Sequence, residues 1–329
     1  LGGSVMVKSE EPEFAVEGEP GFARAQVGGF YRSNARARGH SLSARWVGPG
    51  LSLVLSGSSS QADNLRAGGA FKPASAGREG GPLLPADEVG SSAYRGARNL
   101  DLALALRHGA HLLQVAVGEQ RVGFEGFPNQ RMDMTDNRNV VARLHYSTRQ
   151  PWGELEVKAF GQETRHRMDM GPDRYSYGLG MPMLTQASTR GLSVHANLPL
   201  AEADVLRLGL QYQNHTLYDW WPAVGGTMGP NAFWNIDYGQ RDKADAFAEW
   251  ETPLASHWLG QLGVRGTSVR SNAAVVQGYD NGLGALWGND AAAFNMRDRR
   301  RHDQNWDATA LVRYLPGPTQ RYELGLARK

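Results

Sequence analysis

Apolar and polar residues alternate along most of this 329-residue chain. In one segment, Leu206, Leu208 and Leu210 alternate with Arg207 and Gln211. A period of two is typical of β-strands that have one apolar and one polar face. The alternation predicts about thirteen strands, at 22–32, 36–47, 50–59, 94–107, 111–122, 137–149, 152–165, 187–199, 203–217, 240–252, 256–271, 304–315 and 319–329. The chain is therefore predicted to be all-β.

The predicted strands are long, and the connections between them alternate in length. Most strands have about 10–15 residues, whereas strands of soluble sheets usually have about 5–6. A tilted strand that crosses a bilayer needs about 9–11 residues. Short turns are expected at 48–49, 108–110, 150–151, 199–202, 253–255 and 316–318, and long loops at 60–93, 123–136, 166–186, 218–239 and 272–303. Outer-membrane barrels have this arrangement, with short periplasmic turns and long extracellular loops.

Aromatic residues flank the short turns, as in the interfacial girdle of a membrane barrel. They are Trp46, Tyr146, Trp152, Trp250, Trp258, Tyr314 and Tyr322. A soluble all-β protein would also alternate, but it would not explain the strand lengths, the loop pattern and the girdle together. We therefore predict an antiparallel transmembrane β-barrel. Because a closed bacterial barrel has an even number of strands, thirteen strands suggest an incomplete one.

Composition excludes several classes of function. The chain has no cysteine, which excludes disulfides, thiolate metal sites and cysteine nucleophiles within it. A net charge of +2 gives no electrostatic case for a nucleic-acid partner. We find no catalytic triad, paired-carboxylate site or phosphate-binding glycine loop, so an enzyme is not expected. The 41 glycines fit a chain with many turns.

Methionines cluster in two successive long loops. Six of the nine methionines form three Met-x-Met pairs, where chance predicts about 0.25 pairs. The pairs are Met132/Met134, Met168/Met170 and Met181/Met183, and His166 precedes the second. In an extended backbone, residues i and i+2 point to the same side. Thioethers are soft, neutral ligands that favour Cu(I), and imidazole also binds copper. The alternative is that these methionines only fill space where loops pack.

Two other loops carry candidate binding residues. The loop at 218–222 has the sequence Tyr-Asp-Trp-Trp-Pro, which could cover an organic ligand or form an ordinary interfacial patch. The run at 297–302 is Arg-Asp-Arg-Arg-Arg-His. It could meet lipopolysaccharide phosphates, or it could be a solvated loop.

Five segments resemble the TonB-dependent outer-membrane receptors. Residues 1–8, Leu-Gly-Gly-Ser-Val-Met-Val-Lys, look like the end of that family's plug domain, although Met6 stands where the family often has Asn. The tail at 322–329 resembles one of its mid-barrel strands. Residues 126–137, 166–170 and 175–183 are similar to the copper-receptor branch. In that branch a loop His-x-Met pair completes a copper site with a Cys-x-x-x-Met pair on the plug. His166 and Met168 match the first pair.

The resemblance implies a fold, a location and a partner. Residues 1–20 would be the end of the plug and a linker, and 21–329 the first part of the barrel, with about 13 of an expected 22 strands. The protein would lie in the outer membrane of a Gram-negative bacterium, in contact with lipid and lipopolysaccharide. The inner-membrane TonB complex would drive transport.

Copper is the expected cargo, bound by His166, Met168, Met170, Met132, Met134, Met181 and Met183, and no organic cofactor is expected. Two alternatives stay open. The same class of receptor could carry a siderophore or another metal chelate, contacted by Trp220, Trp221 and Trp234. Otherwise the chain could form a passive barrel in which the methionines only pack.

Overall fold

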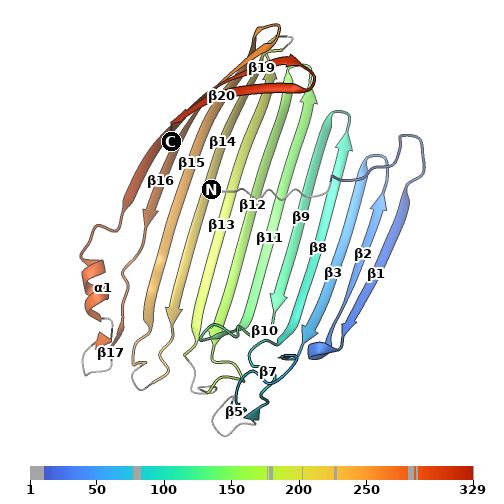
Figure 1. Cartoon of the computed structure of the whole chain (residues 1–329). Helices are drawn as coiled ribbons and strands as arrows, with labels where there is room; N and C mark the ends of the chain where they lie inside the picture. The colour runs from blue at the N-terminus through green and yellow to red at the C-terminus, as the bar shows by residue number, and fades with distance from the viewer. Residues whose placement is uncertain are drawn as a thin grey trace.

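Fourteen strands form one wide antiparallel sheet in the computed structural model of the protein (Figure 1). The structure describes residues 11–76, 83–175, 177, 181–201, 203–225, 228–280, 285–286 and 288–328. The plug-like motif at 1–8 lies outside these residues, as do 176 and 178–180 of the third copper-receptor motif.

Each long strand pairs with the next one along the chain, and adjacent strands run antiparallel. The strands of this sheet are β1 (Phe22–Arg32), β2 (Ala37–Val47), β3 (Leu51–Ala62), β8 (Tyr94–His108), β9 (His111–Val122), β10 (Phe124–Glu125), β11 (Asp133–Gln150), β12 (Gly153–Asp169), β13 (Met183–Pro199), β14 (Val205–Trp221), β15 (Phe233–Ala255), β16 (Trp258–Asn272), β19 (Arg301–Gly317) and β20 (Gln320–Arg328). Within the described residues β1 and β20 each have one neighbour, so they form the two edges of the sheet.

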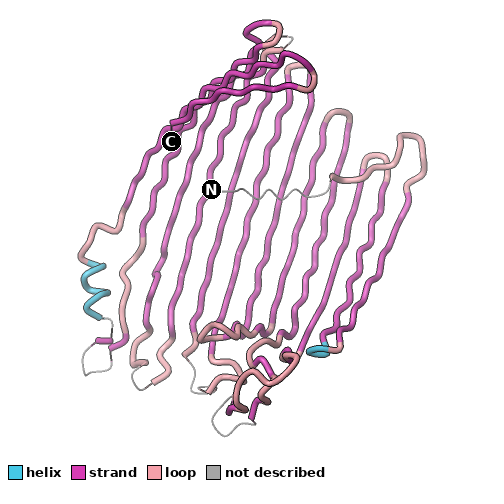
Figure 2. Tube along the Cα trace, viewed as in Figure 1, coloured by secondary structure: helices cyan, strands magenta, loops and turns pink. Residues whose placement is uncertain are grey.

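The smaller elements lie at one end of the sheet, with η1 in the connection between β1 and β2 and the others in the long loops (Figure 2). They are η1 (Asn34–Arg36), the pairs β4 (Leu65–Arg66) with β7 (Glu88–Val89), β5 (Ser75–Ala76) with β6 (Leu83–Leu84) and β17 (Tyr279–Asp280) with β18 (Ala285–Leu286), and the helix α1 (Gly288–Asn295). The short turns lie at the opposite end, at the top of the view. In the described part of the chain, no helix is long and apolar enough to cross a membrane.

All thirteen predicted strands are present, but several extend further into the long loops than predicted. Strand β11 begins at Asp133 rather than 137, β12 continues to Asp169 rather than 165, and β13 begins at Met183 rather than 187. The two-residue strand β10 was not predicted. In these extensions both faces carry polar or mixed residues, so backbone pairing continues where the hydrophobic alternation has ended.

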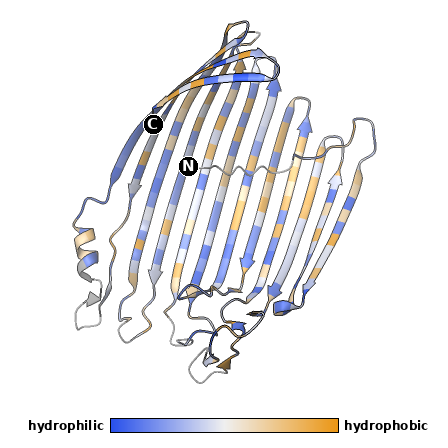
Figure 3. Cartoon of the chain, viewed as in Figure 1, coloured by the Kyte–Doolittle hydropathy of each residue, from blue (hydrophilic) through white to orange (hydrophobic). Residues whose placement is uncertain are grey.

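Residues opposite one another on neighbouring strands form rows across the sheet. Successive rows point alternately to its two sides, one mainly apolar and the other mainly polar (Figure 3). One apolar row crosses five strands through Leu206, Trp250, Leu262, Ala310 and Leu326. We call this side the apolar face. Its large side chains are exposed, and Leu262, for example, is 55% exposed. The apolar face therefore has the character of a surface that contacts lipid.

The opposite side, which we call the polar face, carries ion pairs. Arg207 lies 2.8 Å from Glu249 and 3.4 Å from Glu251. Asp245, with a side chain 3% exposed, is 2.7 Å from Arg265 and 3.2 Å from Lys243. Such pairing satisfies charges that line the interior of a barrel.

Aromatic side chains form a row on the apolar face near the short turns, as predicted. Trp258 stacks on Tyr314 at a centroid distance of 4.5 Å, and Tyr314 stacks on Tyr322 at 6.3 Å. Trp152 and Trp258 are 51% and 44% exposed. Amphipathic rings at this level mark one boundary of the apolar band.

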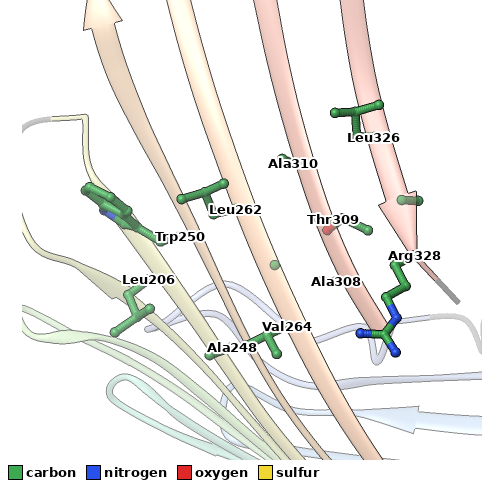
Figure 4. A pocket seen from close by; sticks show the side chains of 12 residues that line it. Leu206, Ala248, Trp250, Leu262, Val264, Ala308, Thr309, Ala310, Leu326 and Arg328 are labelled. Carbon is green, nitrogen blue, oxygen red and sulfur yellow. The ribbon is translucent and has the colours of Figure 1, made fainter. Parts of the chain in front are cut away.

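A shallow hollow of about 680 Å³ lies among the apolar rows of β14, β15, β16, β19 and β20 (Figure 4). Leu206, Trp250, Leu262, Val264 and Leu326 contribute to its lining. The side chains offer few polar groups that could fix a hydrophilic ligand, so this hollow belongs to the lipid-facing surface.

A charged substitution should destabilise the protein on the apolar face and be tolerated on the polar face, even at neighbouring positions of one strand. We expect Leu210→Arg, on the apolar face, to destabilise the barrel in lipid vesicles by about 2 kcal/mol, because a guanidinium must enter hydrocarbon. Gln211→Arg, on the polar face, should change the free energy of unfolding by less than about 0.5 kcal/mol. Urea titration in vesicles measures both values, and equal destabilisation would contradict the assignment of faces.

Candidate functional site

Three methionines from three different pairs form a row across neighbouring strands. Met134 of β11 lies opposite Met168 of β12, and Met168 lies opposite Met183 of β13. Directly opposed residues of antiparallel strands point to the same face, with Cβ atoms about 4.5–5.5 Å apart. The three thioethers therefore lie on one face of the sheet. We call this set the methionine row.

A β-bulge brings Met134 into the methionine row. The pairing of β11 with β12 shifts register between Met134 and Asp136, which leaves Thr135 unpaired. Without this extra residue Met134 would point to the opposite face from Asn137, because side chains alternate along a strand. With it, both side chains share the polar face with His166 and Met168.

One member of each Met-x-Met pair lies just outside the strands. Met132 precedes β11, Met170 follows β12, and Met181 precedes β13. The extended-strand argument therefore applies to only one member of each pair. The other three members, Met134, Met168 and Met183, lie opposite one another on neighbouring strands. Spacing along the chain does not reveal this cross-strand alignment.

His166 lies on the row next to the methionine row. It is opposite Asn137 on β11 and Thr185 on β13, and its Nδ1 is 3.3 Å from the Asn137 Oδ1. This contact favours a proton on Nδ1 and leaves the lone pair on Nε2 for another ligand. Strand β12 begins at Gly153, at the short-turn end of the sheet. The segment from Gly153 to His166 is longer than the roughly 9–11 residues with which a strand crosses a bilayer, so His166 lies beyond the membrane.

Burial favours the neutral form of His166. The half-buried position lowers the pKa of the imidazole, and the nearby carboxylate of Asp219 offsets this only in part. Sequence reasoning missed Asp219, which accepts a hydrogen bond from Thr185 at 2.7 Å and one from Asn235 at 2.8 Å. A neutral imidazole is the form that binds a metal.

The methionine row and His166 supply thioethers and one imidazole, and the Asp219 carboxylate lies near His166. Within the described residues, no group of three or more His, Cys, Asp or Glu side chains could hold a metal ion. A hard cation such as Mg²⁺ or Ca²⁺ requires oxygen ligands, whereas thioethers select soft ions. The site is therefore chemically suited to a soft cation.

A buried ion pair holds the loops that carry the methionines. The Asp133 carboxylate is fully buried, and Arg174 donates to it at 2.6 Å and 3.0 Å. The carboxylate also accepts hydrogen bonds from the Ser91 hydroxyl at 3.1 Å and the Phe127 amide at 3.0 Å. A side chain on Gly171 would collide with Asp133. We call Asp133 and Arg174 the loop lock.

The loop lock joins three loops that are far apart in sequence. Arg174 also donates to the carbonyls of Phe127 and Gln130, at 2.7 Å and 2.6 Å. Close by, the Asp173 carboxylate accepts from the Asn64 side chain at 2.7 Å and from the Ser91 amide at 2.8 Å. The lock therefore fixes the segments before β11, after β12 and before β8 to one another.

Sequence reasoning located only part of this arrangement. The spacing predicts that Asp133 and Asp169 point away from the thioethers. The register confirms this, because the two residues oppose each other one position from Met134 and Met168. Arg174 was missed, since an isolated arginine in a long loop gives no signal before the loops are placed together.

A second hollow, of about 420 Å³, lies between the loops at 218–239 and 272–303, and four aromatic side chains contribute to its lining. Its lining includes Trp221, Phe233, Trp234, Tyr279 and Met181. The rings of Trp221 and Phe233 meet edge to face with their centroids 5.3 Å apart, and the ring centroids of Phe233 and Tyr279 are 5.6 Å apart. We call it the aromatic pocket. Met181 therefore lines a different hollow from the methionine row.

The loop lock predicts that one substitution loosens three loops without affecting the sheet. Arg174→Met leaves the Asp133 carboxylate buried without a cation, which costs about 3–5 kcal/mol. We expect hydrogen exchange to lose protection in 90–93, 126–132 and 171–175, while β11 and β12 keep theirs.

Arg66→Met is the matched control, because Arg66 pairs with Asp87 in the same loop layer at 3.0 Å but is 52% exposed. Exposed pairs contribute about 0–1 kcal/mol, so its loops should keep their protection. Wild-type protection in Arg174→Met would show that the lock does not hold these loops.

Comparison with known proteins supports the fold. No family model matches the sequence, and no curated protein matches it. Among solved structures, the copper transporter OprC matches with a TM-score of 0.68 and 16% identity, over 96% of this chain and 46% of that chain. The FrpB iron transporter from Neisseria meningitidis matches with a TM-score of 0.63 and 13% identity, over 94% of this chain and 46% of that chain.

The ferric yersiniabactin uptake receptor FyuA from Yersinia pestis matches with a TM-score of 0.60 and 14% identity, over 96% of this chain and 47% of that chain. This chain thus spans about half the length of the structures that it matches. At such low identities the likeness concerns the fold alone. The chain has the fold of part of the β-barrel of TonB-dependent receptors.

Proposed function

We propose that the chain is part of a transporter that takes up copper across the outer membrane of a Gram-negative bacterium. The observation that carries this proposal is the methionine row, with His166 on the next row of the same face. Thioethers select Cu(I), and imidazole also binds copper, so three thioethers and a neutral imidazole suit a copper ion.

The position of the site fits capture from outside the cell. The methionine row lies where β11, β12 and β13 meet their long loops, and long loops of such barrels are extracellular. Its side chains share the polar face, which lines the interior of a barrel. An ion bound there would stand at the entrance to the lumen.

Selectivity would come from ligand softness rather than from charge. Thioethers carry no charge, so they do not attract the abundant hard cations outside the cell. The loop lock would hold the methionine loops before cargo arrives and so reduce the ordering cost of binding. Asp133 and Arg174 are positioning residues here, since they reach the site through the backbone.

The matched structures are transporters and receptors, and we infer the same general role for this protein rather than an enzymatic one. Energy for release would come from the inner-membrane TonB complex through a plug domain. The expected boundaries are 1–20 for the end of the plug and its linker and 21–329 for the barrel.

Copper retention should depend on the methionine row. We expect Met134→Leu/Met168→Leu/Met183→Leu to bind Cu(I) at least tenfold more weakly than wild type, measured by competition with a chromogenic Cu(I) chelator. Leucine keeps the approximate volume and apolarity of methionine, so the loss reports the thioether sulfur atoms rather than packing.

The matched control changes the other member of each pair, as Met132→Leu/Met170→Leu/Met181→Leu. It removes the same number of thioethers from the same loops but leaves the methionine row intact, so it should lose less affinity. Wild-type affinity in the row variant would contradict the copper site and favour a barrel in which the methionines only pack.

The aromatic pocket supports a second candidate function, uptake of an organic metal chelate. Trp221, Phe233 and Tyr279 present ring faces and edges in a hollow large enough for part of a chelator. Aromatic contacts of this kind contribute about 0.5–1.5 kcal/mol each beyond area burial.

If a chelate is the cargo, Trp221→Leu should weaken binding of ferric complexes of aromatic chelators about three- to tenfold and leave Cu(I) affinity unchanged. Trp152→Leu, at the short-turn end of the sheet, is the control. Fluorescence quenching measures both affinities. Absence of ferric-chelate binding by the wild type would eliminate this candidate.

A further inference from the structure

Asp219 of β14 lies on the row that carries His166. The register places His166 opposite Thr185 on β13, and Thr185 opposite Asp219. Directly opposed residues point to the same face, so Asp219 shares the polar face with His166. Neighbouring strands lie about 4.7–4.9 Å apart, so the backbones of His166 and Asp219 are separated by roughly 10 Å. A charge at this distance acts on an ion bound beside the imidazole.

Asp219 is the only charged side chain in the rows around His166. Three successive rows of the polar face cross β11 to β14 at this level. They are Asn139, Thr164, Ala187 and Leu217 in the first row, Asn137, His166, Thr185 and Asp219 in the second, and Met134, Met168 and Met183 in the third. Among these described residues all but Asp219 are uncharged while the imidazole is neutral. The carboxylate therefore determines the net charge of the site.

No cation compensates this carboxylate in the part of the chain that the structure describes, where Asp219 forms no ion pair. Its oxygens accept hydrogen bonds from neutral groups instead. The Thr185 hydroxyl donates to Oδ1 at 2.7 Å, and the Asn235 amide donates to Oδ2 at 2.8 Å. Hydrogen bonds to a charged group are roughly twice as strong as neutral ones, so they hold the carboxylate in place. Asp219 is thus a fixed negative charge whose two oxygens are already hydrogen-bonded.

A fixed negative charge does not act equally on the two oxidation states of copper. The Coulomb energy is proportional to the charge of the bound ion, and Cu(II) carries twice the charge of Cu(I). The factor by which Asp219 raises the affinity for Cu(II) is therefore the square of the factor for Cu(I). Thioethers select Cu(I). The charge of Asp219 opposes that preference.

We propose that Asp219 is a specificity-determining residue of the copper site, which raises the affinity for Cu(II) relative to Cu(I) through its charge. Since the carboxylate acts on an ion held by the methionine row and His166, this role rests on the copper function proposed above. Hard divalent cations experience the same charge, but they require several oxygen ligands, and both oxygens of Asp219 already accept hydrogen bonds. Softness therefore still excludes hard cations, whereas Asp219 sets the balance between the two copper ions.

Asp219→Asn in the intact protein tests this role, because it removes the charge and keeps the shape of the side chain. We expect the affinity to fall about tenfold for Cu(II) and about threefold for Cu(I), measured by competition with a chromogenic chelator of each ion. A merely structural role would act by moving the donors that both ions share, and both affinities would then fall by the same factor. Asp219→Glu keeps the charge and should retain the affinity for Cu(II) within about threefold of wild type.

Asp242→Asn is the matched control. The Asp242 carboxylate also accepts hydrogen bonds from neutral groups, the Asn214 amide at 2.6 Å and the Tyr212 hydroxyl at 3.2 Å. Alternation along β15 places it on the side of Trp250, which is the apolar face. The same charge is thus removed from the opposite side of the sheet, and both copper affinities should stay at their wild-type values.

Equal fold losses for the two ions in Asp219→Asn, or wild-type affinity for Cu(II), would overturn the role of Asp219 and leave the copper site standing. Loss of Cu(II) affinity in Asp242→Asn to the same extent would also overturn it, because the effect would then not depend on position. Wild-type Cu(I) affinity in the leucine variant of the methionine row would instead contradict the copper function, and the role of Asp219 with it.

Discussion

Every backbone N–H and C=O group that lies in hydrocarbon must find a partner within the protein, and the rest of this structure follows from that requirement. The antiparallel ladder from β1 to β20 satisfies it strand by strand. A continuous ladder also fixes which residues stand opposite one another. Because side chains alternate, the same register that exposes Leu206 and Leu262 to lipid places Arg207 and Glu249 on the polar face.

Register also assembles the candidate site. The bulge at Thr135 changes the parity of β11 at one point, and Met134 then joins Met168 and Met183 on the polar face. The loop lock lies on the other side of the same segment, where Asp133 is fully buried against Arg174. The start of β11 thus presents Met134 of the methionine row on one side and is held on the other side by the ion pair of Asp133 and Arg174.

The sequence predicted the fold well and the site only partly, for physical reasons. Lipid imposes strict alternation on Leu206–Tyr212 and similar segments, so strand positions could be read directly. Beyond the membrane the alternation stops although pairing continues, so the ends of β11, β12 and β13 were predicted several residues short. The methionine row depends on cross-strand register and on one bulge, and the loop lock joins residues such as Ser91 and Arg174 from different loops. Neither relation is visible in local spacing.

X-ray absorption spectroscopy of the copper-loaded protein tests the central claim most directly, because it reports the atoms bound to the metal. The account predicts a first shell dominated by sulfur, with one nitrogen from His166, and loss of the sulfur signal when the methionine row is replaced by leucine. A shell made only of nitrogen and oxygen atoms, unchanged in that variant, would contradict the account.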